Sequence, residues 1–143
     1  MPLRHKLNGL SDDEYARRFR ELLEDSIRLR LISDVPLGTC LSGGLDSSSI
    51  VCVIDKLMRE KGLKLPGMSS GQKTFSALFH EKEFDERSFI HNVVSKTGVD
   101  AYYTCPSGEG LWKTLPVLIW KQEEPFTRPY VYVQWEGYKL DRQ

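Results

Sequence analysis

The chain has 143 residues, 40% of them apolar, and a formal net charge of zero. Because the charges balance, electrostatics gives no reason to expect nucleic acid or an anionic membrane as a partner. The longest apolar run, residues 50–54, is too short to span a bilayer. The amino-terminal residues show no pattern of a secretory signal. The three cysteines are widely spaced and form neither a zinc-binding pair nor a disulfide framework. We therefore expect one domain, located in the cytoplasm.

The first half of the chain predicts two helices on either side of a short strand. Ser11 and Glu14 form a capping box that begins a helix running to about Ile32. Its expected buried face keeps helical spacing: Tyr15, Phe19, Leu22, Leu23 and Ile27. Pro36 ends this helix, and residues 37–41 have the length of a strand. The apolar face expected for the second helix consists of Ile50, Val53, Ile54, Leu57 and Met58.

The second half continues the alternation. Residues 61–73 are predicted to form a loop, residues 74–79 a second strand and residues 100–104 a third. Between these strands, Asp85 or Glu86 begins a helix that ends at Gly98. Its expected buried face consists of Phe89, Ile90, Val93 and Val94.

A fourth helix is predicted from Ser107 onward, and a last helical stretch follows an acidic turn at residues 123–126. Pro116 lies inside the fourth helix or else starts a second, short one. This order of elements predicts an α/β fold, a parallel sheet with helices on both faces. With about three strands and no stop signal at its end, the domain is expected to be truncated. It would span residues 11–143, after a linker at residues 1–10.

The candidate site is the turn between the first strand and the second helix. Gly43 and Gly44 let the backbone approach a bulky anion without a Cβ clash, and the amides at the start of the helix favour negative charge. Asp46 fits such a site when Mg²⁺ accompanies phosphate groups. Three hydroxyl donors lie in the same turn: Ser42, Ser47 and Ser48. The turn therefore predicts a site for a tetrahedral oxyanion such as pyrophosphate.

Two other phosphate-binding motifs are excluded. The turn contains no lysine, which excludes the GxxxxGK[ST] loop, and its glycines are adjacent, which excludes the GxGxxG fingerprint. An interpretation without a ligand stays open, in which Asp46 and Ser47 only cap the helix.

The string Ser-Gly-Gly-Leu-Asp-Ser-Ser at residues 42–48 resembles the PP-loop of ATP pyrophosphatases, and specifically that of glutamine-hydrolysing asparagine synthetases. Further segments resemble the same family in the same order: residues 33–38, 74–76, 84–86 and 123–126. The resemblance covers most of the chain from about residue 11 onward. It implies a fold similar to the PP-loop ATP pyrophosphatases and adenine nucleotide α-hydrolases.

The activity implied by this resemblance is that of an ATP-dependent, amide-forming ligase of the asparagine synthase type. ATP would adenylylate the side-chain carboxylate of aspartate, pyrophosphate would leave, and ammonia would attack the aspartyl-AMP. Leu41 and Ala77 match family positions that contact the nucleotide largely through backbone atoms, and Asp46 is the candidate Mg²⁺ ligand. No catalytic side chain is identified. The residues expected to bind the pyrophosphate part of ATP are Ser42, Gly43, Gly44, Asp46, Ser47 and Ser48.

The sequence departs from the family pattern in two places. The family's glutaminase domain begins with a cysteine directly after the initiator methionine, whereas Pro2 follows Met1 here, so a glutaminase domain is expected on another or a longer chain. The family also has a second motif of the Ser-Gly-Glu-Gly type with an acidic pair. Residues 107–110 resemble it but lie too early, and we interpret them as a helix start.

Three functional hypotheses stay open. The chain is an asparagine-forming ligase domain or a fragment of one, a related synthetase that adenylylates another acid, or a nucleotide-binding remnant without turnover. Glu123 and Glu124 either orient Mg²⁺ or substrate, or cap a helix. Cys40 and Cys52 are expected to be buried. The family strand order 3-2-1-4-5 would leave the first strand at an edge, so the isolated chain is expected to self-associate.

Overall fold

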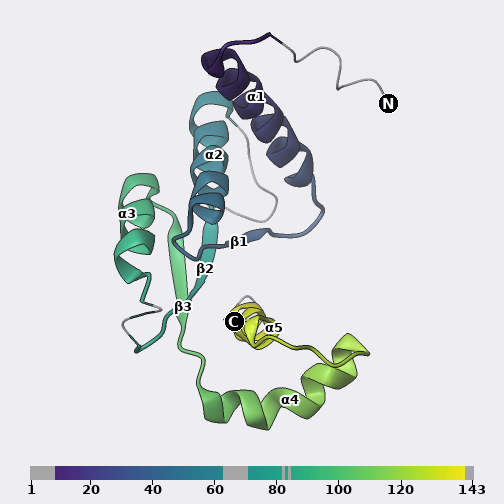
Figure 1. The fold of residues 1–143 in the computed structure, drawn as a ribbon. Coiled ribbons are helices and arrows are strands. Elements are labelled where there is room, and N and C mark those ends of the chain that lie inside the picture. The colour runs from purple at the N-terminus through teal and green to yellow at the C-terminus, as the bar shows by residue number, and fades with distance from the viewer. Residues whose placement is uncertain (1–8, 63–70, 82, 84, 141–143) are drawn as a thin grey trace.

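The computed structural model describes residues 9–62, 71–81, 83 and 85–140 (Figure 1). Strands and helices alternate as predicted, and the α/β class is confirmed. Residues 1–8 of the predicted linker, most of the loop at 61–73, Phe84 and residues 141–143 lie outside the described residues. The elements are α1 (Asp12–Arg30), β1 (Gly38–Cys40), α2 (Leu45–Lys61), β2 (Lys73–Ala77), α3 (Arg87–Thr97), β3 (Asp100–Thr104), α4 (Gly108–Gln122) and α5 (Tyr130–Leu140).

The sheet is parallel, with the strand order β1-β2-β3, so β1 lies at an edge of the described sheet as expected. Its central strand is buried on both faces. Thr74 and Ser76 point to one face, and Phe75 points to the other because side chains alternate along a strand. Helices therefore cover both faces.

One face of the sheet is covered by α2 and α3, since successive right-handed crossovers in the same direction place their helices on the same side. A core cluster joins the sheet to these two helices: Leu41, Val51, Ile90 and Val99. α5 packs against β2 and β3, and α4 packs on α5, at the lower end of the molecule in Figure 1. A separate cluster holds this helical pair: Leu118, Val131 and Tyr132.

The capping box of α1 is confirmed, because the Ser11 backbone amide donates to Glu14 and the Glu14 amide donates to the Ser11 hydroxyl. The predicted buried face of α1 is largely wrong. Only Ile27 is buried, while Phe19 is 67% exposed, and Tyr15 and Leu22 are also exposed. The reason is that α1 packs on α2 through its C-terminal half alone.

The other predicted helix faces need smaller corrections. In α2, Ile54 and Leu57 are buried against α1, whereas Ile50 is exposed and the unpredicted Val51 is fully buried against the sheet. In α3, Ile90 is buried but Phe89 is exposed. α2 thus packs against α1 on one side and against the sheet on the other, so its buried residues do not form a single apolar face.

The expected burial of Cys40 and Cys52 is wrong, because both are exposed. Cys40 lies on the edge strand β1, and Cys52 faces a groove between α1 and α2. Partial desolvation nevertheless raises the pKa of the Cys40 thiol. This shift keeps the thiol protonated and makes it a poor nucleophile.

Pro116 lies within one continuous helix, α4, so the alternative of a second helix start is wrong. Ser107 caps α4 by accepting a 3.1 Å hydrogen bond from the Gly110 amide, which confirms that residues 107–110 form a helix start. None of the helices in the described part of the chain combines the length and apolarity that a membrane crossing requires.

Candidate functional site

The candidate loop begins where the sheet stops. The Leu41 amide donates a 2.9 Å hydrogen bond to the Phe75 carbonyl oxygen, which extends the pairing of β1 with β2 by one residue. The Leu41 side chain is 1% exposed and belongs to the core under α2 and α3. Leu41 therefore fixes the loop to the sheet through its backbone and to the core through its side chain.

Gly43 occupies a position that only glycine fits. Its φ of +78° lies in the left-handed region, which side chains with a Cβ rarely adopt. A Cβ at this position would also stand 3.0 Å from the Cβ of Phe89 and 3.3 Å from the carbonyl oxygen of Glu86. The loop backbone is thus pressed against the start of α3.

Gly44 is different, although the sequence places the two glycines side by side. Its φ of −67° and ψ of 161° are open to any residue, and the nearest atom to an added Cβ is the Ser42 hydroxyl at 3.5 Å. Gly44 is the N-cap of α2 and has no side chain with which to cap it. The amides of the first turn therefore have no side-chain cap, and they carry the positive end of the dipole of a 17-residue helix.

The hydroxyl of Ser47 makes hydrogen bonds to the backbone within the loop. It donates to the Gly44 carbonyl oxygen at 3.1 Å and accepts from the Ser42 amide at 3.3 Å. The Ser42 and Ser47 hydroxyl oxygens are also 3.1 Å apart. Either hydroxyl can be the donor between these two oxygens. These contacts hold the turn in one shape.

Of the three remaining predicted residues, Ser48 lies in α2 and its amide donates to the Gly44 carbonyl oxygen, while Asp46 and Ala77 lie at the same end of the sheet. Asp46 is exposed in the first turn of α2, where a carboxylate also complements the helix dipole. Ala77 is the last residue of β2, and continuing the β1–β2 register by two residues places it level with Ser42. The carboxyl edge of the sheet thus brings together Leu41, the loop and Ala77. A ligand in an open α/β sheet binds at this edge.

Two residues that back the loop were missed at the sequence level. Glu86 and Phe89 contact the space that a Cβ of Gly43 would fill. The sequence predicts Phe89 on the buried face of its helix and Glu86 as a possible start of that helix, within the family-like segment at residues 84–86, but it predicts neither as a site residue. Glu123 and Glu124 lie elsewhere. They line a cavity of about 430 Å³ with Ile119, Trp120 and Pro125, at the turn after α4.

The described residues contain no preformed metal-binding cluster. Across residues 9–62, 71–81, 83 and 85–140, no three His, Cys, Asp or Glu side chains are grouped to hold a metal ion. Mg²⁺ is often held by one or two carboxylates together with phosphate oxygens and water. Asp46 is exposed in the first turn of α2, where a carboxylate could take part in such an arrangement.

Comparison with known proteins places this loop in a family. The asparagine synthase family model matches residues 18–139. The chain belongs to the asparagine synthase family. The glutamine-hydrolyzing asparagine synthetase 1 of Bacillus subtilis is 30% identical over 118 residues, which cover 82% of this chain and 17% of that protein.

Two further relatives show the breadth of the family. Amidase chyE of Penicillium rubens is 32% identical over 120 residues, covering 80% of this chain and 18% of that protein. The glutamine-hydrolyzing asparagine synthetase of Zea mays is 37% identical over 92 residues, covering 57% of this chain and 16% of that protein. The chain thus spans 16–18% of the length of these relatives.

Proposed function

We propose that the chain carries the ATP-binding loop of an asparagine synthase-type ligase domain. Family membership supports a synthetase-type enzyme. The substrates proposed are ATP, the side-chain carboxylate of aspartate or of a similar acid, and ammonia. The ammonia would come from a glutaminase domain on another or a longer chain.

The observation that carries this proposal is the backbone at Gly43. Its left-handed conformation, held against Glu86 and Phe89, turns the chain directly into the side-chain-free N-cap of α2, where the amides of the first turn have no side-chain cap. Such a turn accepts a pyrophosphate group whose oxygens approach the backbone closely. The Ser42 hydroxyl lies in this turn, Ser47 holds the shape of the turn, and Ser48 follows near the start of α2.

The proposed reaction uses this turn at the departing end of ATP. A carboxylate oxygen of aspartate attacks the α-phosphorus, and the bond from that phosphorus to the bridging oxygen breaks. Pyrophosphate leaves with the electron pair. Donors aimed at its oxygens stabilise the negative charge as it develops. Ammonia then attacks the activated carbonyl carbon, the carbon–oxygen bond to AMP breaks, and loss of a proton leaves the amide.

Mg²⁺ supplies shielding of the phosphate charges, and Asp46 is the residue proposed to hold it. The backbones of Leu41 and Ala77 are proposed to border the nucleoside, since both lie at the carboxyl edge of the sheet. A related synthetase that adenylylates another acid would use the same loop. The comparisons do not favour that alternative, because the amidase of Penicillium rubens and the asparagine synthetases match this chain at similar identities, between 30% and 37%.

The decisive experiment is titration calorimetry of the full chain with ATP and Mg²⁺, with pyrophosphate and Mg²⁺, and with AMP. If the loop binds the phosphates, ATP should bind at least ~10-fold more tightly than AMP, and pyrophosphate should compete with ATP. Equal affinity for ATP and AMP would contradict a pyrophosphate site. Absence of all three binding events would favour the interpretation of the turn as a helix cap alone.

A further inference from the structure

Arg87, the first residue of α3, contacts two separate points of the chain between β2 and α3. Its Nη2 nitrogen donates a 3.1 Å hydrogen bond to the backbone carbonyl oxygen of Phe79, eight positions earlier in the sequence. Its Nε nitrogen lies 3.4 Å from a carboxylate oxygen of Asp85, and the same oxygen accepts a 3.1 Å hydrogen bond from the Arg87 backbone amide. Phe79 follows the end of β2 by two residues. Arg87 therefore ties the chain that leaves β2 to the beginning of α3.

Helix electrostatics do not favour an arginine at this position. A cation at the amino-terminal end of a helix opposes the helix dipole, and the first turn of α3 contains no acidic residue. Asp85 offsets the charge of Arg87 only in part, because both side chains are partly exposed to solvent. What the arginine contributes here is the contact with Phe79 and Asp85, at the start of a helix that lies against the candidate loop.

The start of α3 is the fixed end of this tie. Ile90 is 1% exposed and shares a core cluster with Leu41, the residue from which the candidate loop begins. The Ile90 amide donates a 3.0 Å hydrogen bond to the Glu86 carbonyl oxygen, and Glu86 and Phe89 lie against Gly43. Core packing therefore holds the phosphate side of the proposed site independently of the Arg87 side chain.

The chain after β2 is the end that depends on Arg87. The Leu78 amide donates a 2.8 Å hydrogen bond to the Thr104 carbonyl oxygen, which continues the pairing of β2 with β3 by one residue. Beyond Leu78 the chain leaves the sheet, and Arg87 holds it at Phe79. Ala77, the proposed border of the nucleoside, is two residues away from this contact.

We propose that Arg87 is a positioning residue, which holds the nucleoside border at Ala77 in place relative to the phosphate-binding loop at Gly43. This inference rests on the proposed function, because it requires that ATP occupy both parts of the site. A planar guanidinium suits this role, since its nitrogens contact two acceptors in a fixed geometry. Without Arg87 the loop keeps its position and the chain after β2 shifts. ATP, which contacts both parts, then loses affinity, whereas pyrophosphate, which needs only the loop, does not.

The test is titration calorimetry of the full chain with ATP and Mg²⁺ and, separately, with pyrophosphate and Mg²⁺. Arg87→Met should raise the dissociation constant of ATP ~3–10-fold and that of pyrophosphate by less than ~2-fold. Arg28→Met is the matched control, because the Arg28 side chain is also 48% exposed and pairs with Asp25 within α1. This control should leave both dissociation constants unchanged. Thermal unfolding followed by far-UV circular dichroism verifies that each variant is folded.

Arg87→Lys separates the charge of the side chain from its geometry. Lysine keeps the positive charge but lacks the planar fork, so this variant should also lose affinity for ATP and not for pyrophosphate. Full ATP affinity in Arg87→Lys would show that the charge alone is sufficient, which overturns the proposal. Equal losses for ATP and pyrophosphate in Arg87→Met also overturn it, since they indicate direct contact with the phosphate groups or a general loss of structure.

The failure of this inference is distinguishable from the failure of the proposed function. If the original chain binds ATP and pyrophosphate and Arg87→Met binds both equally well, Arg87 has no positioning role and the proposed function stands. If the original chain binds neither ligand, the proposed function is wrong, and the role of Arg87 is refuted with it.

Discussion

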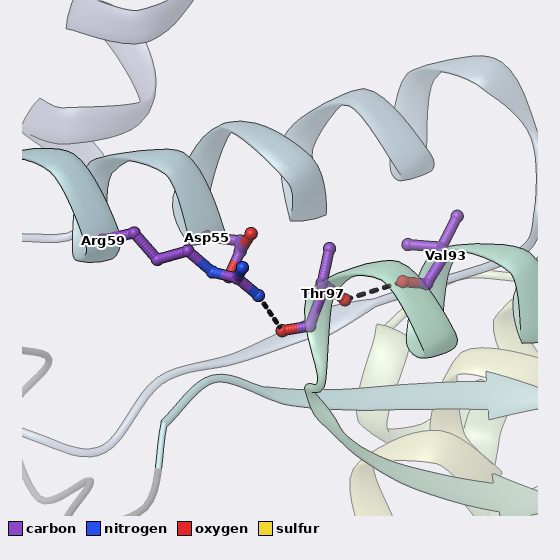
Figure 2. Close-up of polar contacts among 4 residues, drawn as sticks. All are labelled: Asp55, Arg59, Val93 and Thr97. Atoms are coloured by element: carbon purple, nitrogen blue, oxygen red, sulfur yellow. Dashed lines mark hydrogen bonds and ion pairs between the residues drawn. The ribbon is translucent and has the colours of Figure 1, made fainter.

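The guanidinium of Arg59 donates a 2.8 Å hydrogen bond to the backbone carbonyl oxygen of Thr97, which joins the C-terminal part of α2 to the last residue of α3 (Figure 2). Arg59 is held by Asp55 at 2.7 Å on its own helix, and the Thr97 hydroxyl donates to the Val93 carbonyl oxygen at 2.7 Å. A cation at the carbonyl end of a helix also complements its dipole. This contact fixes the relative position of the two helices that cover the same face of the sheet.

Arg59→Met should therefore destabilise the fold. The substitution keeps most of the aliphatic stem and removes the hydrogen bond and the charge, so we expect a loss of about 1 kcal/mol in the free energy of unfolding. The loss is kept small because the guanidinium is partly exposed. Arg17→Met is the matched control, since its ion pair with Glu21 lies within a single helix and is solvent-exposed. Urea unfolding measures both, and equal effects would refute the role of Arg59.

The two glycines of the loop should respond differently to alanine. Gly43→Ala places a Cβ in the left-handed region and against α3, so it should lower the free energy of unfolding by roughly 1–3 kcal/mol and weaken ATP binding. Gly44→Ala meets neither obstacle, so its effect on the free energy of unfolding should be clearly smaller. Thermal unfolding and calorimetry on the pair measure the difference. Indistinguishable variants would show that the backbone shape at Gly43 does not determine binding.

The carboxylate of Asp46 is predicted to act through Mg²⁺. Asp46→Asn keeps the side-chain shape and removes the charge, so the gain in ATP affinity on adding Mg²⁺ should fall by about 10-fold. Glu60→Gln, at the opposite end of the same helix, is the control and should leave that gain unchanged. If Asp46 is only a helix cap, Asp46→Asn will lower stability while the magnesium dependence persists.

The capping box of α1 predicts a pH dependence of stability. Hydrogen bonds from the backbone amide and the hydroxyl of Ser11 lower the pKa of Glu14 from its ordinary value of 4.5. Because the pKa is lower in the folded state than in the unfolded state, the contribution is complete above 4.5 and is lost as the pH falls through the folded-state pKa.

Glu14→Gln should remove this component of the acid sensitivity. The measurement is the free energy of unfolding between neutral pH and pH below the folded-state value, compared for the two chains. Asp13→Asn, one residue earlier in the same turn, is the control. Parallel pH profiles of the original chain and Glu14→Gln would contradict the prediction.

Local features could be predicted from the sequence. The capping box of α1, the Ser107 cap of α4 and the helix end at Gly98 depend on residues close together in the chain, and the structure has all three. The strand order followed from the family resemblance, and the alternation of strands and helices predicted a parallel sheet. The position of the loop at the carboxyl edge of the sheet followed from the same alternation.

Burial was decided by the tertiary structure, because it depends on what lies opposite a side chain. Apolar spacing predicted the same environment for Phe19 and Ile27, yet α2 covers only the second. Val51 is fully buried because the sheet lies beneath α2, a layer that the periodicity of one helix does not reveal.

The candidate site likewise has features that the sequence predicts and features that only the tertiary structure determines. The hydroxyl donors and the acidic residue of the site lie in one continuous segment, residues 42–48, because a turn between a strand and a helix is local in the sequence. The distinction between Gly43 and Gly44 was not predictable from that segment. Gly43 has a left-handed φ and Gly44 does not, and Glu86 and Phe89, which come more than forty positions later in the sequence, lie against Gly43 alone. Two adjacent glycines have the same conformational freedom, and the folded structure determines which of them uses it.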